Sequence, residues 1–103
     1  MAMVRLLVLY GTPTDASSFD RYYQQTHIPI ARRLPGLRSY AINRGPLQAL
    51  AGDAPHLVAT LEFDSMADFN AALTSEEGQA TAADLANFAS GGVQMLVYEP
   101  AEA

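Results

Sequence analysis

The run from Met3 to Tyr10 constrains the fold most, because as a strand it is apolar on both faces. One face carries Val4, Leu6, Val8 and Tyr10, and the other carries Leu7 and Leu9. Residues 93–98 repeat this pattern. Such strands are typical of sheets covered on both sides, and a large bare apolar face is unusual for a monomer. A chain of 103 residues has no spare element for the second face, so we expect a homodimer that packs sheet to sheet.

The remaining chain alternates between helical and extended patterns. Either Asp15 or Ser17 can cap a first helix that extends to Arg33 and is ended by Pro35 and Gly36. The further predicted elements are strands at 37–44 and 56–64, a loop at 45–55, a helix over 65–73, a further helical stretch over roughly 75–88 that is interrupted near Gly78, and a strand at 93–98. This β-α-β-β-α-β order predicts a ferredoxin-like α+β fold, in which a four-stranded antiparallel sheet carries both helices on one face. We expect a single domain over residues 1–103.

Composition excludes several kinds of chemistry. The chain has no Cys and no Lys, which removes thiolate metal sites, disulfides, thiol nucleophiles and Schiff-base lysines. Its two His residues show no metal-ligand spacing, so we predict no metal site. The net charge of −5 argues against nucleic-acid binding. No apolar run approaches the length of a membrane helix and no secretory signal is evident, so we expect a cytoplasmic protein without a membrane partner.

The positive charge is concentrated in one part of the chain. Five of the six Arg residues lie between positions 21 and 44, where there is no Asp or Glu. These arginines either complement the helix dipole and lie at solvated strand ends, or attract an acidic small molecule.

His27 is the first candidate for a functional group. The apolar face of its predicted helix consists of Phe19, Tyr22, Tyr23, Thr26, His27 and Ile30, so the imidazole points inward. Imidazole, with a pKa of about 6.5, carries protons at neutral pH. Pro29 cannot donate a hydrogen bond to Gln25, so we expect the helix to kink or loosen there and leave a cavity. The alternative is a buried neutral His bonded to a backbone carbonyl.

Five other side chains are weaker candidates. Tyr40 either polarises a ligand carbonyl or is an ordinary strand residue. Tyr22 and Tyr23 either line a flat ligand pocket or belong to the core. Arg5, a charge within an apolar strand, either meets an anionic ligand or lies at an exposed strand end. His56, at the start of its strand, is expected to face solvent.

Two segments carry a family resemblance. The run Phe19-Asp20-x-Tyr22-Tyr23-x-x-x-His27-x-Pro29 and the run Leu34-Pro35-Gly36-Leu37-x-x-Tyr40 resemble the EthD family of dimeric α/β-barrel proteins. The resemblance implies a homodimer whose two sheets close into a barrel, with a ligand cavity between sheet and helices in each subunit.

The same resemblance implies roles for two residues. In a similar methylmuconolactone methylisomerase, a His on the first helix and a Tyr on the second strand, matching His27 and Tyr40, act without metal or organic cofactor. That enzyme also uses a Cys, which this chain lacks, so its full mechanism does not transfer.

Two functions follow as hypotheses. The first is a cofactor-independent enzyme of small-molecule catabolism that acts on a small cyclic or aromatic carbonyl compound. His27 and Tyr40 would transfer the proton, with Arg5, Tyr22 and Tyr23 as ligand-binding residues, in an isomerase, cyclase or decarboxylase reaction. The alternative is a non-catalytic small-ligand-binding or accessory protein of a degradation pathway.

Overall fold

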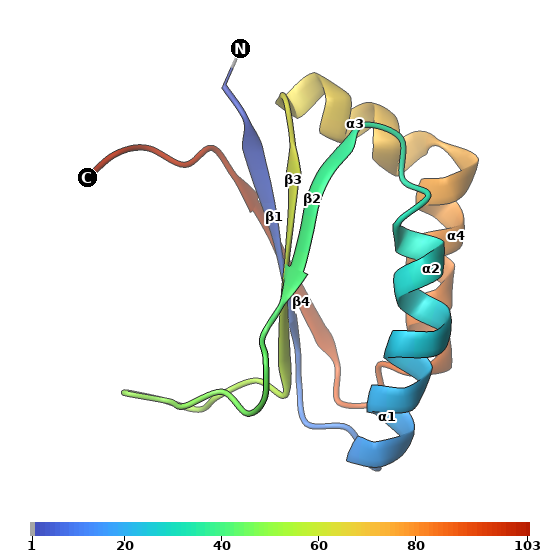
Figure 1. Ribbon diagram of the computed structural model, residues 1–103, viewed down its shortest axis with the longest axis vertical. Coiled ribbons are helices and arrows are strands. Elements are labelled where there is room, and N and C mark those ends of the chain that lie inside the picture. The colour runs from blue at the N-terminus through green and yellow to red at the C-terminus, as the bar shows by residue number, and fades with distance from the viewer. Residues whose placement is uncertain (1) are drawn as a thin grey trace.

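A computed structural model describes residues 2–103 and shows a four-stranded antiparallel sheet with every helix on one face (Figure 1). The elements are β1 (Val4–Tyr10), α1 (Ala16–Tyr22), a π-helical turn (Tyr23–His27), α2 (Ile28–Ala31), β2 (Leu37–Ile42), β3 (Leu57–Phe63), α3 (Met66–Thr74), α4 (Glu76–Asp84), a 3₁₀ turn (Leu85–Asn87) and β4 (Val93–Tyr98). The strand order is β2-β3-β1-β4, and all neighbours are antiparallel. The predicted ferredoxin-like fold is therefore confirmed.

The helix starts follow from short polar side chains. Of the two candidates at the first helix, Asp15 is the cap, because its carboxylate accepts the Ser18 N–H at 3.0 Å. The Ser65 hydroxyl accepts the Asp68 N–H at 3.1 Å at the start of α3. These bonds satisfy N–H groups that have no partner within the helix.

The first helix loosens next to His27, as Pro29 predicts. The chain runs through α1, the π-helical turn Tyr23–His27 and α2 as one rod (Figure 1). The Ile28 N–H donates to the carbonyl of Tyr23, five residues back. Because Pro29 has no N–H to give to the carbonyl of Gln25, the helix widens by one residue per turn instead of breaking. Such π-bulges are frequent at functional sites.

A bulge in β2 determines where Tyr40 points. Leu37 pairs with Phe63 and Tyr40 pairs with Leu61, and the register shifts between Leu37 and Ser39. In a regular strand, residues three apart face opposite sides. The extra residue turns both Leu37 and Tyr40 toward the helices.

The two faces of the sheet differ sharply in their cover. Toward the helices, β1 and β3 bury Val4, Val8, Tyr10, Leu57, Ala59, Leu61 and Phe63. On the opposite face no element packs over Leu7, Leu9, Val58, Leu96 and Tyr98 (Figure 1). The side chains of Leu96 and Tyr98 remain 47% and 43% exposed. Within residues 2–103, the apolar outer face predicted from β1 is thus uncovered.

The predicted interruption near Gly78 is wrong, because α4 runs unbroken from Glu76 to Asp84; its N-cap is Ser75, where the sequence predicts that this helical stretch begins. The Ser75 hydroxyl caps α4 by accepting the Gly78 N–H at 3.0 Å. Gly78 itself is buried within α4, where a Cβ atom would collide with the carbonyl oxygens of Ala72 and Leu73 at the end of α3. The glycine therefore permits the close approach of two helices.

We predict that Gly78→Ala lowers the free energy of unfolding by roughly 1–3 kcal/mol, the usual cost of overpacking. Urea unfolding of both proteins measures the change. Helix propensity alone gives the opposite sign, because Ala is favoured over Gly by about 1 kcal/mol within a helix. A stabilised variant would therefore contradict the close contact of α3 and α4. Ala80→Gly, at an exposed position of α4, calibrates the propensity effect alone.

Candidate active site

His27 lies on the π-helical turn with its ring buried, at 3% exposure. Its Nδ1 is 2.9 Å from Oδ2 of Asp84, which ends α4 and is also buried. The other oxygen of this carboxylate accepts the Tyr22 hydroxyl at 2.6 Å and the side-chain amide of Asn87 at 3.0 Å. Asp84 thus accepts hydrogen bonds from Tyr22, His27 and Asn87, and it links the first helix to the end of α4.

These contacts fix the charge and the tautomer of the pair. Although burial raises the pKa of Asp84, hydrogen bonds from Tyr22, Asn87 and His27 outweigh it and hold that pKa below its ordinary value. Burial lowers the pKa of His27, and the Asp84 carboxylate offsets this only in part. At neutral pH the carboxylate is ionised and the imidazole is neutral. Because an ionised carboxylate only accepts, His27 carries its proton on Nδ1, and Nε2 presents a lone pair.

Nε2 of His27 has no hydrogen-bond partner among the described residues. No fully buried side-chain nitrogen or oxygen in residues 2–103 lacks such a partner. Nε2 therefore retains accessible surface although the residue as a whole is buried. A neutral imidazole with Nδ1 held by a carboxylate and Nε2 free has the arrangement of a general base.

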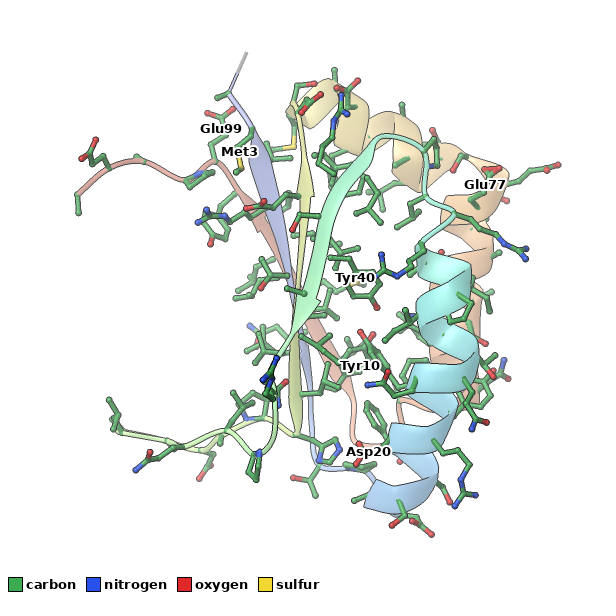
Figure 2. The ribbon with its side chains drawn as sticks, in the orientation of Figure 1. Met3, Tyr10, Asp20, Tyr40, Glu77 and Glu99 are labelled. Carbon is green, nitrogen blue, oxygen red and sulfur yellow. The ribbon has the colours of Figure 1, made fainter. Side chains whose placement is uncertain are left out.

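Tyr23 lies beside His27, with ring centres 5.3 Å apart, and it contacts two further tyrosines. The hydroxyl groups of Tyr23 and Tyr40 are 2.6 Å apart, and the rings of Tyr10 and Tyr23 meet edge to face at 5.5 Å. Tyr10 and Tyr40 project from the sheet toward the helices (Figure 2). Burial raises the pKa of all three phenols, so they stay protonated. One of the Tyr23 and Tyr40 hydroxyl groups donates its proton to the hydrogen bond between them. The hydroxyl that accepts this bond keeps its own proton to donate.

These side chains surround a small space that we call the inner cavity. It has a volume of about 90 Å³ and is lined by Tyr10, Tyr23, His27 and Tyr40 together with mainly apolar residues of the sheet and of α4. Cavities of about 150 Å³ hold a benzene molecule, so this one accepts at most part of a small ring. The structure therefore brings His27, Tyr40 and Tyr23 to one cavity.

The remaining candidates lie elsewhere. Tyr22 does not line the inner cavity, and its hydroxyl supports Asp84 behind His27. Arg5 is on the outer face of the sheet, where its Nε is 2.7 Å from Glu62. His56 is not free in solvent: its Nε2 bonds to Asp20 at 2.8 Å, and its ring packs edge-on against Phe19.

Of the five arginines between positions 21 and 44, one lies near the site. Arg38 pairs with Asp64 on the surface at 2.6 Å. The Arg32 guanidinium lies 5.7 Å from the centre of the Tyr40 ring, within the range of a cation–π contact.

Sequence reasoning missed Asp84 and Tyr10. A signal for Asp84 is present, because Thr81, Leu85 and Phe88 recur at helical spacing and Asp84 shares their face. A carboxylate on an apolar helix face requires a partner. For Tyr10, the alternation of β1 indicates the inner face of the sheet but not a place in the site.

The described residues hold no group of three or more His, Cys, Asp or Glu side chains arranged to bind a metal ion. None of the helices in residues 2–103 is both long and apolar enough to cross a membrane.

Comparison with known proteins identifies the family to which this chain belongs. The EthD domain matches residues 12–92, and the chain belongs to the EthD family, as the motif residues predict. It is 41% identical over 96 residues, or 91% of both chains, to an uncharacterized 11.0 kDa protein of the thcB–thcC intergenic region of Rhodococcus erythropolis.

Solved structures agree on the fold. An EthD family protein from Bacillus halodurans superposes with a TM-score of 0.86 at 29% identity, over 96% of this chain and 99% of that one. SnoaB from Streptomyces nogalater, a cofactor-independent oxygenase, superposes with a TM-score of 0.70 at 14% identity, over 100% of this chain and 97% of that one. The second likeness shows the fold alone.

We predict that the imidazole of His27 titrates with a midpoint below 6.5, because burial lowers its pKa. Asp84→Asn should move this midpoint lower still, since it removes the charge that favours imidazolium. NMR titration of the imidazole resonances measures both values. Asp20→Asn, which alters the carboxylate beside the other histidine, should leave the His27 midpoint in place. A midpoint above 6.5 would contradict the neutral imidazole.

Proposed function

We propose that this protein is an enzyme of small-molecule catabolism that moves a proton on a small cyclic or aromatic carbonyl compound, without a cofactor. The observation that carries the proposal is that the His27–Asp84 pair and the Tyr23–Tyr40 hydroxyl pair belong to residues that line one inner cavity. A base and an oxyanion donor in one apolar cavity are the parts that enolate chemistry requires.

The proposed reaction begins with His27. Its Nε2 removes a proton from the carbon next to the carbonyl group, and the electron pair of the broken C–H bond passes to the carbonyl oxygen. The hydroxyl of Tyr40 donates a hydrogen bond to this developing oxyanion. Asp84 stabilises the imidazolium, as the carboxylates of His-dependent enzymes do.

Return of the proton completes the cycle. Delivery from Nε2 to a different carbon of the enolate gives an isomer, and attack of the enolate on a second carbonyl gives a cyclised product. A bound β-keto acid gives the same enolate when Nε2 of His27 removes its carboxyl proton and the C–C bond to the carboxyl group breaks to release carbon dioxide; the imidazolium then returns this proton to the enolate carbon. The apolar walls exclude water and so strengthen these interactions. Isomerase, cyclase and decarboxylase activities therefore share one set of residues.

A non-catalytic ligand-binding role is the second candidate. It is favoured by the 2.6 Å bond between the hydroxyl groups of Tyr23 and Tyr40, which already occupies part of the hydrogen-bonding capacity that an oxyanion needs. Both functions use the same cavity, and only turnover distinguishes them.

Proton exchange tests the proposal even though the natural substrate is not identified. We expect the protein to catalyse deuterium incorporation from D₂O into members of a panel of enolisable cyclic ketones and unsaturated lactones, followed by ¹H NMR. His27→Ala should lower the rate by roughly 10²–10⁴-fold, and Tyr40→Phe should lower it less. Gln25→Ala, at an exposed position of the same turn, should retain the rate. Binding of panel members without exchange, or exchange that survives His27→Ala, would favour the non-catalytic role.

We also propose that the protein is a homodimer joined through the outer face of the sheet. This face presents Leu7, Leu9, Leu96 and Tyr98 with no cover from residues 2–103, and such patches mark interfaces between proteins. The Arg5–Glu62 pair lies on the same face, half-exposed, where it would border the apolar contact.

Leu96→Glu should therefore produce a monomer, because a carboxylate placed in this contact would be buried without a partner. Size-exclusion chromatography with light scattering measures the mass. Ala83→Glu, on the exposed surface of α4, is the matched control and should remain a dimer. A monomeric wild-type protein at micromolar concentration would refute the interface.

A further inference from the structure

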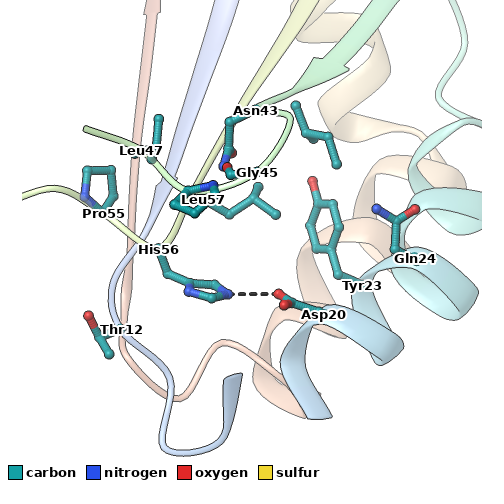
Figure 3. A pocket seen from close by; sticks show the side chains of 12 residues that line it. Thr12, Asp20, Tyr23, Gln24, Asn43, Gly45, Leu47, Pro55, His56 and Leu57 are labelled. Carbon is teal, nitrogen blue, oxygen red and sulfur yellow. Dashed lines mark hydrogen bonds and ion pairs between the residues drawn. The ribbon is translucent and has the colours of Figure 1, made fainter. Parts of the chain in front are cut away.

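A second hollow, which we call the outer pocket, lies beside the inner cavity. It has a volume of about 550 Å³ and is formed by α1 and the segments that follow β2 and precede β3 (Figure 3). This volume is in the range of pockets that hold metabolite-sized ligands, whereas the inner cavity, at about 90 Å³, is far below it. A carbonyl compound that reaches His27 must leave most of its atoms outside the inner cavity.

The two hollows follow one another along the same face of the sheet. On β2, Tyr40 lines the inner cavity and Ile42, the next residue on that face, lines the outer pocket. On β3, Ala59 lines the inner cavity and Leu57, two residues away on the same face, lines the outer pocket. Residues two apart in a strand are separated by about 7 Å. The outer pocket is therefore the nearest large space to the inner cavity along both strands.

Tyr23 is the partition between them, because its side chain lines both hollows. Its ring is 1% exposed, and its hydroxyl is held by Tyr40 at 2.6 Å. A rotation of this side chain would break that bond, connect the two hollows and release the Tyr40 hydroxyl for a ligand. Tyr23 also begins the π-helical turn, where the helix backbone is least regular.

The polar groups of the outer pocket favour a hydrogen-bond donor. Asp20 and His56 face each other across its mouth at 2.8 Å, with side-chain exposures of 59% and 21% (Figure 3). No Arg lines this pocket among the described residues. The amide of Asn43 is already engaged with the Gly45 carbonyl and the Val58 N–H. The carboxylate of Asp20 and the side-chain amide of Gln24 are thus the accessible binding groups, and the carboxylate selects hydroxyl or ammonium groups against anions.

We infer that the inner cavity and the outer pocket form one bipartite ligand site, gated by Tyr23, for a molecule with a single small ring and a hydroxyl- or amine-bearing tail. The ring end enters beside His27 and Tyr40, and the tail binds Asp20 and His56. This inference rests on the proposed function for the ring end, and it adds the class of ligand and the group that recognises its tail.

The two histidines of the chain make the test direct, because each hollow contains one. We would titrate the protein with phenol, with 3-phenoxy-1,2-propanediol and with phenoxyacetate, and follow both imidazoles by NMR. Once Tyr23 rotates aside and enlarges the inner cavity, phenol should shift the His27 resonances more than those of His56. The diol should shift both histidines and bind about tenfold tighter than phenol, the effect of a hydrogen bond to a charged group. Phenoxyacetate should not gain this factor, because Asp20 repels its carboxylate.

Asp20→Asn should remove the advantage of the diol and leave phenol binding unchanged, whereas Asp53→Asn, at an exposed position outside the pocket, should change neither. If the His27 resonances shift but the diol binds no tighter than phenol, or if its tighter binding survives Asp20→Asn, the bipartite site is overturned and the proposed function stands. Shifts confined to His56 for the diol would show two separate hollows, which also overturns it. Tight binding of phenoxyacetate would overturn the ligand class. No shift of His27 with any of the three compounds would overturn both proposals.

Discussion

The hydrogen bond between His27 and Asp84 is the interaction on which the site depends. It links residues 57 positions apart and ties the π-helical turn to the end of α4. Two buried charges facing each other would carry a large desolvation cost. Here only the carboxylate is charged, because burial keeps the imidazole neutral, and Tyr22 and Asn87 supply the other hydrogen bonds. The pair is therefore a neutral imidazole bonded to a carboxylate, which is the arrangement that the proposed base requires.

Most of the fold could be predicted from the sequence because its signals are local or periodic. The alternation in β1 and β3, the caps at Asp15 and Ser65 and the helical spacing around His27 all lie within a few residues of the structure they produce. The same holds for the loosened turn before Pro29, since a missing N–H acts on a carbonyl four residues back. Such features do not depend on how the rest of the chain folds.

The parts that escaped prediction are set by contacts distant in sequence. The β2 bulge decides that Tyr40 faces the cavity, and it exists because β2 must match the register of β3. Asp84 becomes the partner of His27 only when α4 packs beside the first helix. Gly78 is a residue type that can interrupt a helix, and only the close approach of α4 to α3 explains its place inside α4. In each case the deciding neighbour is on another element.

One register governs both the inner cavity and the outer face of the sheet. Leu6, Val8 and Tyr10 form part of the cavity wall, whereas Leu7 and Leu9 between them point to the uncovered side. A slip of one residue would exchange the two sets and would place apolar side chains where Tyr10 now contacts Tyr23. The seven consecutive pairs between β1 and β3 therefore fix the site and the proposed dimer contact together. The proposed dimer would explain why so short a strand is apolar on both sides, because each face would then have its own partner, one in the same chain and one in a second copy.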